Sequence, residues 1–343
     1  MLPVLEQNYG NASSKSHAFG WHAEELINIA REQVANLINA EPEEIYFTSG
    51  ATESNNLALK GTLKKGQPVA SSKIEHSSVL EPLFSLKEIN LDLIEVNEKG
   101  ILKDFDVQNY NLISLMLANN EIGTVQDLEP IFSKAKKLKI ITHSDATQAI
   151  GKILVDVKKL KVDLLSISAH KIYGPKGIGA LYINKNLLNF SPLIHGGSQE
   201  NKIRPGTQNV AGIVGLGKAC EIAKERIDLD QKHLTKLKKK FLELLDKNGV
   251  KYKINGCLKS RIPGNINLAF SQTDNVKLIS KLSTKLAIST SSACLTDSSK
   301  PSHVLTAIGL SEKEIKSSIR IGLGRFNTLQ EIEKAVILIK EAI

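Results

Sequence analysis

Small polar residues gather where a strand-like run, Ile45–Thr48, gives way to a helix-like stretch. The run Ser49-Gly50-Ala51-Thr52 stands at that turn. Small side chains let the backbone approach a ligand closely, and the free N–H groups at a helix start favour a phosphate. The same residues can instead simply cap the helix. This cluster alone therefore leaves a phosphate site and a helix cap both open.

A carboxylate and a lysine follow two further strand-like runs. Asp145 comes just after Ile140–His143, where it can cap a helix or pair with a protonated ring nitrogen of a cofactor. Lys171 follows shortly after the run Val162–Ser168 and precedes a glycine-rich turn. A lysine there is costly to bury unless it pairs or reacts, for example with an aldehyde cofactor. A solvated lysine at a loop entrance is the alternative.

Strand-like and helix-like segments alternate through the first two thirds of the chain. This alternation predicts an α/β fold with a mostly parallel sheet that is covered by helices on both faces. Such sheets bind ligands at the carboxyl ends of their strands, which is where the polar clusters stand. The segments include strands over Ile45–Thr48, Leu112–Leu117, Ile140–His143, Val162–Ser168 and Ile178–Ile183, and helices over 21–38, 51–63 and 130–137.

The pattern changes after about residue 213. A long helical stretch continues as far as Leu245, a strand is expected near Asn265–Phe270, and a helix begins at Leu329. We therefore predict a large domain over residues 1–225 and a smaller α+β domain over residues 226–343.

Composition narrows the class of protein. Lys and Arg exceed Asp and Glu, 45 against 36, but the densest lysine run lies on a helix-like face and aromatic residues make up only 5%. A solvated helix face is therefore favoured over a nucleic-acid surface. The three cysteines are widely spaced, so neither a disulfide framework nor a metal site is expected. With no apolar run of membrane-spanning length and no export signal, we expect a soluble cytoplasmic protein.

The order of the clusters, together with several further motifs, resembles the class V aminotransferase group of fold-type I pyridoxal-phosphate enzymes. More specifically it resembles the cysteine desulfurases, and the resemblance runs through nearly the whole chain. It is carried by Ser49-Gly50-Ala51-Thr52-Glu53-Ser54-Asn55-Asn56, Glu75-His76, Asn119-Asn120-Glu121-Ile122-Gly123, His143-Ser144-Asp145-Ala146-Thr147-Gln148, Ser168-Ala169-His170-Lys171, Arg204-Pro205-Gly206-Thr207-Gln208-Asn209, Ser292-Ala293-Cys294 and Arg320-Ile321-Gly322-Leu323-Gly324-Arg325-Phe326.

The resemblance implies how pyridoxal 5′-phosphate would be held. Lys171 would bind the cofactor covalently, Asp145 would pair with its ring nitrogen, and Gln148 would pair with its ring hydroxyl. His76 would stack on the ring and shuttle protons.

The resemblance also implies a phosphate site that two subunits share. Ala51, Thr52, Ser168 and His170 would hold the phosphate within one subunit. Thr207 matches the position that reaches the phosphate of the other subunit, which implies a homodimer.

Substrate and sulfur roles follow from the same resemblance. Asn120 would lie at the edge of the cofactor, and Arg320 would bind the carboxylate of L-cysteine. Cys294 would take the sulfur as a persulfide, which makes alanine the other product. Its small, polar flanks predict a mobile segment. Cys220 and Cys257 are expected to be structural or incidental.

The long tract between Cys294 and Pro301 favours the housekeeping branch, which supplies iron–sulfur cluster assembly and other thiolation. Relatives begin upstream with a strand and a Leu-Asp-x-x-Ala-Thr-Thr-like stretch, and many continue past Ile343 with a tail that grips the scaffold protein. We therefore expect the chemistry to survive and leave docking of the acceptor open. The alternatives are a selenocysteine lyase and a cofactor-binding dimer of impaired activity that acts as a scaffold.

Overall fold

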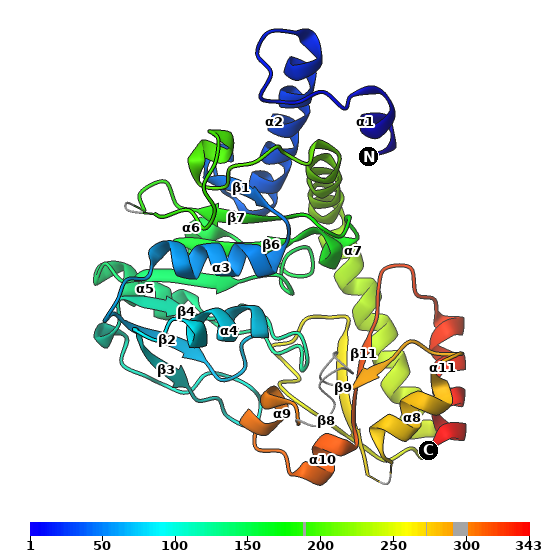
Figure 1. Cartoon of the computed structure of the whole chain (residues 1–343). Helices are drawn as coiled ribbons and strands as arrows, with labels where there is room; N and C mark the ends of the chain where they lie inside the picture. The colour runs from blue at the N-terminus through cyan, green and yellow to red at the C-terminus, as the bar shows by residue number, and fades with distance from the viewer. Residues whose placement is uncertain (188–189, 272, 291–300) are drawn as a thin grey trace.

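The computed structural model describes residues 1–343 apart from 188–189, 272 and 291–300. Its described part contains two sheets, joined by the long helix α7, Val210–Lys247 (Figure 1). The first sheet has seven strands in the order β1-β7-β6-β5-β4-β2-β3, and the second has four in the order β10-β11-β9-β8.

The strands of the first sheet are mostly parallel, as predicted. Strands β3, β2, β4, β5 and β6 pair in parallel, and β7 is antiparallel to both β6 and β1. The seven strands are β1 Ile45–Thr48, β2 Pro68–Ser72, β3 Asn90–Ile94, β4 Leu112–Ser114, β5 Ile141–Asp145, β6 Leu164–Ser168 and β7 Gly179–Ile183.

Helices cover both faces of this sheet, because neighbouring residues of a strand point to opposite sides. In β6, Leu164 packs in a cluster with Leu57 of α3, whereas Leu165 belongs to the main core with Ile27 of α2. The helices before α7 are α1 Leu2–Gln7, α2 Ala18–Ile38, α3 Ala51–Thr62, α4 Ser77–Ser85, α5 Glu129–Lys137 and α6 Val157–Leu160, with short 3-10 helices η1 Pro42–Glu44, η2 Val107–Asn109, η3 Ala169–Ile172 and η4 Gln199–Lys202.

The second sheet is antiparallel and has its own apolar core. Leu268 and Phe270 of β9 pack there with Val336 and Ile339 of α11. The elements of this part are β8 Tyr252–Ile254, β9 Asn265–Phe270, α8 Asn275–Leu282, β10 Ser289–Thr290, α9 His303–Ala307, α10 Glu312–Lys316, β11 Ser318–Gly322 and α11 Leu329–Ala342.

Helix α7 takes part in both cores. Its early residues, the last of them Cys220, belong to the main core, and from Leu237 onward its buried apolar residues belong to the second core. The boundary predicted near residue 225 lies between these positions, inside the helix, and the division into two domains stays a prediction.

Two predicted strand ends differ from the structure. The strand expected over Leu112–Leu117 ends at Ser114, and the one expected over Ile140–His143 is β5, which continues to Asp145. Asp145 is therefore the last residue of its strand. Within the described part of the chain, no helix is both long and apolar enough to cross a membrane.

Candidate active site

Strand register brings the first and third sequence clusters together. Thr48, the last residue of β1, and Ser168, the last of β6, both stand opposite Gly179 of β7. A Cβ on Gly179 would lie 2.7 Å from the Gly50 Cα, so only glycine lets these backbones approach so closely. The turn before α3 and the residues after β6 therefore meet at one edge of the sheet.

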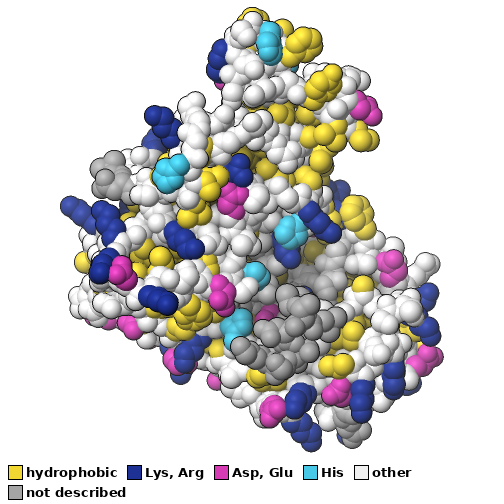
Figure 2. Space-filling model, viewed as in Figure 1, with side chains coloured by type: hydrophobic (Ala, Val, Ile, Leu, Met, Phe, Trp, Pro, Cys, Tyr) yellow, Lys and Arg dark blue, Asp and Glu magenta, His cyan; other side chains and the backbone are white. Residues whose placement is uncertain are grey.

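A cavity of about 480 Å³ opens at this edge. Of the predicted site residues that the structure describes, all except Thr207 line it, and they include residues of both sheets. Figure 2 shows a hollow between the two parts of the molecule, with several histidine side chains near it. The predicted residues in the lining are Ala51, Thr52, His76, Asn120, Asp145, Gln148, Ser168, His170, Lys171 and Arg320.

Lys171 lies in η3, directly after β6. Burial and the Arg320 guanidinium lower the pKa of its amine, and Asp145 opposes this effect. A lowered pKa increases the fraction of neutral amine, which is the nucleophilic form. The position and the electrostatics of Lys171 therefore suit attack on an aldehyde.

The end of the cavity beside α3 can hold an anion. Gly50 precedes the helix and supplies no side-chain cap, so the first N–H groups, at Ala51 and Thr52, have no side-chain acceptor there. Ser168 Oγ lies 2.9 Å from His170 Nδ1. Burial, followed by Lys171 and Lys176, lowers the pKa of His170. Together these groups offer the N–H and O–H donors that a phosphate requires.

A chain of hydrogen bonds links Asp145 to His76. The Asn55 amide donates to Asp145 Oδ2 at 2.9 Å and to Ser78 Oγ at 2.8 Å. Ser78 Oγ lies 2.8 Å from His76 Nδ1, which also accepts from the Ser78 main-chain N–H at 3.1 Å. Because Nδ1 accepts, the ring proton of the neutral imidazole is on Nε2. Burial lowers the pKa of His76, so this neutral form is favoured.

Asp145 receives a second donor from its own strand end. The main-chain N–H of Thr147 donates to Asp145 Oδ1 at 2.9 Å. Each carboxylate oxygen thus has one protein donor, and two N–H bonds fix the orientation of the group. A carboxylate held in this way can pair with a cationic ring nitrogen in the cavity.

Arg320 in β11 reaches across to Asn120, which lies in a turn after β4. It donates to the Asn120 main-chain oxygen at 3.4 Å, and among the described residues this bond leaves most of its guanidinium donors for a ligand. Gln148 accepts from Lys152 at 2.7 Å. Lys152 therefore contacts a predicted cofactor-binding residue, although no sequence motif pointed to it.

Comparison with known proteins places the chain in a family. Residues 1–335 match the model of the aminotransferase class V family. The chain belongs to the aminotransferase class V family. It is 45% identical to the cysteine desulfurase IscS of Colwellia psychrerythraea, over 98% of this chain and 86% of that protein.

Solved structures agree with this assignment. A NifS-like protein superposes on this class V chain with a TM-score of 0.91 at 36% identity, covering 99% of this chain and 93% of that one. A structure described as SspA in complex with cysteine has a TM-score of 0.81 at 35% identity, covering 95% and 94% of the two chains.

One predicted residue of this class V chain lies away from the cavity, and another falls outside the residues that the structure describes. Thr207 is exposed in the loop before α7, and Cys294 lies outside the described residues. The other two cysteines, Cys220 and Cys257, are buried and line neither this cavity nor the adjoining one.

Sequence reasoning missed two members of the hydrogen-bonded chain. Asn55 lies inside a motif that was quoted for its phosphate turn, and Ser78 is two residues after His76. A signal for Ser78 existed, since a His-x-Ser sequence before an apolar stretch is compatible with a helix N-terminus. No sequence spacing could show that Asn55 bridges Ser78 to Asp145, because these residues lie on three separate elements.

Proposed function

We propose that this chain is a pyridoxal-phosphate-dependent cysteine desulfurase, which converts L-cysteine to L-alanine and transfers the sulfur to Cys294. One observation carries the proposal: Lys171, Asp145 and the uncapped start of α3 share a single cavity. The relatives named cysteine desulfurase support the choice of reaction within the family.

The residues around the cavity fit pyridoxal phosphate. The N-terminus of α3, Ser168 and His170 would hold its phosphate, and Asp145 would hold the proton on its ring nitrogen. Lys171 would provide the amine for covalent attachment. When bound, the cofactor supplies an aldehyde that condenses with amines and a ring that withdraws electrons.

The protein's own groups would then orient the substrate and move protons. Arg320 would bind the carboxylate of L-cysteine, a geometry that suits a planar guanidinium. Lys171, with its lowered pKa, would take and return a proton near the α-carbon. His76, with its proton held on Nε2, would stack on the cofactor ring and shuttle protons.

Sulfur transfer on the bound substrate would need no added oxidant or reductant. The Cys294 thiolate would attack the sulfur of the bound cysteine, the bond between that sulfur and the β-carbon would break, and a proton would return to the carbon product. L-cysteine plus the enzyme thiol thus give L-alanine plus an enzyme persulfide, with atoms and electrons balanced. Transfer to an iron–sulfur scaffold or another acceptor would follow.

A homodimer is part of the proposal. Thr207 lies away from the cavity of its own chain, which suits a contact with the partner's phosphate. Large apolar side chains are also exposed on the first two helices and beside them, where Figure 2 shows a yellow patch. They are Met1, Leu2, Leu5, Tyr9, Phe19 and Trp21. Light scattering of the purified protein would give the mass of a dimer.

The decisive experiment follows alanine formation from L-cysteine in the presence of a thiol acceptor. Cys294→Ser should abolish persulfide formation and reduce alanine production by at least a hundredfold. Cys257→Ser, a matched change at a cysteine away from the cavity, should keep activity within about twofold. Undiminished turnover in the Cys294 variant would overturn its role. Comparing turnover of cysteine and selenocysteine separates the desulfurase from a selenocysteine lyase, and bound cofactor without turnover would indicate a scaffold.

A further inference from the structure

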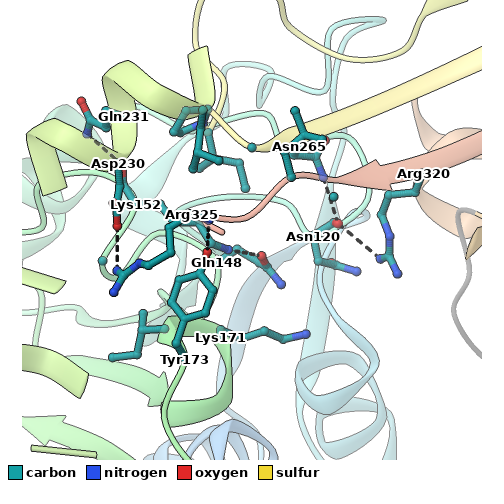
Figure 3. Close-up of a pocket in the computed structure, with 18 residues that line it drawn as sticks. Asn120, Gln148, Lys152, Lys171, Tyr173, Asp230, Gln231, Asn265, Arg320 and Arg325 are labelled. Atoms are coloured by element: carbon teal, nitrogen blue, oxygen red, sulfur yellow. Dashed lines mark hydrogen bonds and ion pairs between the residues drawn. The ribbon is translucent and has the colours of Figure 1, made fainter. Parts of the chain in front are cut away.

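A second cavity adjoins the candidate active site. It measures about 220 Å³ and shares Asn120, Gln148, Lys171 and Arg320 with the first. Figure 3 shows its remaining charged groups on the side away from Arg320, where Lys152, Asp230 and Arg325 point into the same space. The proposed reaction assigns no task to these three residues.

Basic side chains outnumber acidic ones around this cavity. Four basic side chains, which are cations when protonated, line it, and Asp230 is the one carboxylate among its described lining residues. Asp230 is already engaged, because Arg325 Nη2 lies 2.7 Å from its Oδ2 and Arg226 Nε lies 3.3 Å from its Oδ1. The four cations are Lys152, Lys171, Arg320 and Arg325.

Two of the cationic groups have hydrogen-bond donors to spare. The Arg325 side chain is only 9% exposed and its guanidinium stacks over the Tyr173 ring at 4.3 Å, yet its Nε has no acceptor among the described residues. Lys152 donates to the neutral Gln148 amide at 2.7 Å and forms no ion pair with any residue that the structure describes. A buried donor without an acceptor is destabilising, so the cavity favours a ligand that brings acceptors.

We propose that this cavity is a binding site for a small carboxylate anion, separate from the position of the substrate carboxylate. A carboxylate would supply a negative charge beside Arg320 and Arg325 and an acceptor for Lys152, whose amine it would draw into the charged form. Because Gln148 and Arg320 line both cavities, an anion bound here would alter the electrostatic environment of the candidate active site. Binding does not require turnover, so a failed desulfurase assay and a failed binding assay can be told apart.

Protonation of Lys152 supplies an independent signature. Burial and the neighbouring Lys171 lower the pKa of Lys152 to about 7, so its amine is largely neutral at pH 8. A bound anion would raise that pKa and draw a proton onto the amine. The other titratable side chains that line the cavity are Lys171, Tyr173, Asp230, Arg320 and Arg325.

The test is calorimetric titration of the cofactor-loaded full chain with malonate at constant ionic strength. We expect saturable binding, weakened at least tenfold by Lys152→Met. It should be retained within about threefold by Lys152→Arg, which keeps the positive charge. Lys137→Met removes an exposed lysine from α5 and should change the dissociation constant less than twofold. Malonate should stay bound in the presence of saturating L-alanine, because the carboxylate of L-alanine would occupy Arg320 and not the proposed anion site.

Several outcomes would overturn the site. They are no binding, an unchanged dissociation constant in Lys152→Met, or displacement of malonate by L-alanine, which would place malonate at the substrate position. If Lys152→Met does not fold, the unmodified protein still decides the matter. If the bound anion draws a proton onto Lys152 at pH 8, the buffer must release that proton. The binding heat should therefore change with the ionisation enthalpy of the buffer, with a sign that corresponds to proton uptake by the protein. A binding heat that is the same in all buffers would contradict the proposal.

Discussion

Asn55 Nδ2 lies 2.9 Å from Asp145 Oδ2, and the same amide nitrogen lies 2.8 Å from Ser78 Oγ. A single buried amide thus orients the carboxylate of one strand end and, through a serine, the imidazole of His76. Both of its N–H donors are used, and its own oxygen has no partner among the described residues. Asn55 is therefore a positioning residue for two groups that would contact the cofactor ring.

Asn55→Ala should weaken cofactor binding by about 5- to 30-fold, because hydrogen bonds to charged groups contribute roughly 1.5–3 kcal/mol and part is recovered by solvent. Absorbance titration of the cofactor-free protein measures this change, and the pH dependence of the bound spectrum should shift as well. Asn56→Ala, at the next position of the same helix, removes a side-chain bond to the Thr52 main-chain oxygen and should change binding less than twofold. Equal effects of the two substitutions would contradict the role of Asn55.

Covalent attachment should occur at Lys171 and not at Lys152, although both amines line the second cavity. Only Lys171 also lines the cavity that contains Asp145 and the start of α3. Borohydride reduction of the holoenzyme, followed by peptide mass mapping, should place the cofactor on Lys171 alone. In Lys171→Ala the absorbance of the attached cofactor should disappear and turnover should fall by more than a thousandfold. Label on Lys152 in the unmodified protein would refute this assignment.

The stability of the fold should decrease as the pH rises from about 5 to 8. Burial, together with the nearby Asp145 carboxylate, raises the pKa of Glu75 from 4.5 to about 8, and the hydrogen bonds that the Met116 N–H and Ser72 donate to it oppose this rise. The folded chain keeps this proton over a pH range in which the unfolded chain has lost it, so stability is lost as pH rises through that range.

Glu75→Gln should remove part of this pH dependence. Between pH 5 and pH 8.5 the free energy of unfolding should fall by about 1–3 kcal/mol less in this variant than in the unmodified protein. Urea denaturation at the two pH values measures this difference. Glu333→Gln, at an exposed site on α11, should leave the slope unchanged. Some slope should remain, because burial also raises the pKa of Glu121 to about 7. An unaltered slope in Glu75→Gln would show that the group is ionised in the folded chain.

Gly179→Ala should destabilise the fold by about 2 kcal/mol and weaken phosphate binding, since the new Cβ would lie 2.5 Å from the Ile167 main-chain oxygen and 2.7 Å from the Gly50 Cα. Thermal unfolding and inorganic phosphate binding measure the two effects. Gly322→Ala is the matched control, because a Cβ there meets nothing within 4 Å. Comparable losses in the two variants would show that the contact with Gly50 does not matter.

The alternating pattern of the sequence predicted the sheet and most of its strands. Strand β1 and helix α2 were predicted closely, because buried apolar residues recur with the period of each element. Strands β2, β3, β8, β10 and β11 were not proposed. Lys-rich and polar flanks obscure them, and β3 and β8 are partly exposed. Strand order could not be predicted, because it depends on which buried faces pack together.

By itself, the sequence determined the family, the mostly parallel sheet and the chemical types of the candidate site, since these follow from residue identity and order along the chain. Only the tertiary structure decided that Asn55 joins Asp145 to Ser78, and that Lys152 and Arg325 share a cavity short of negative charge. Such contacts join segments far apart in the sequence. Their distances are set by how helices and strands pack, which no local spacing encodes.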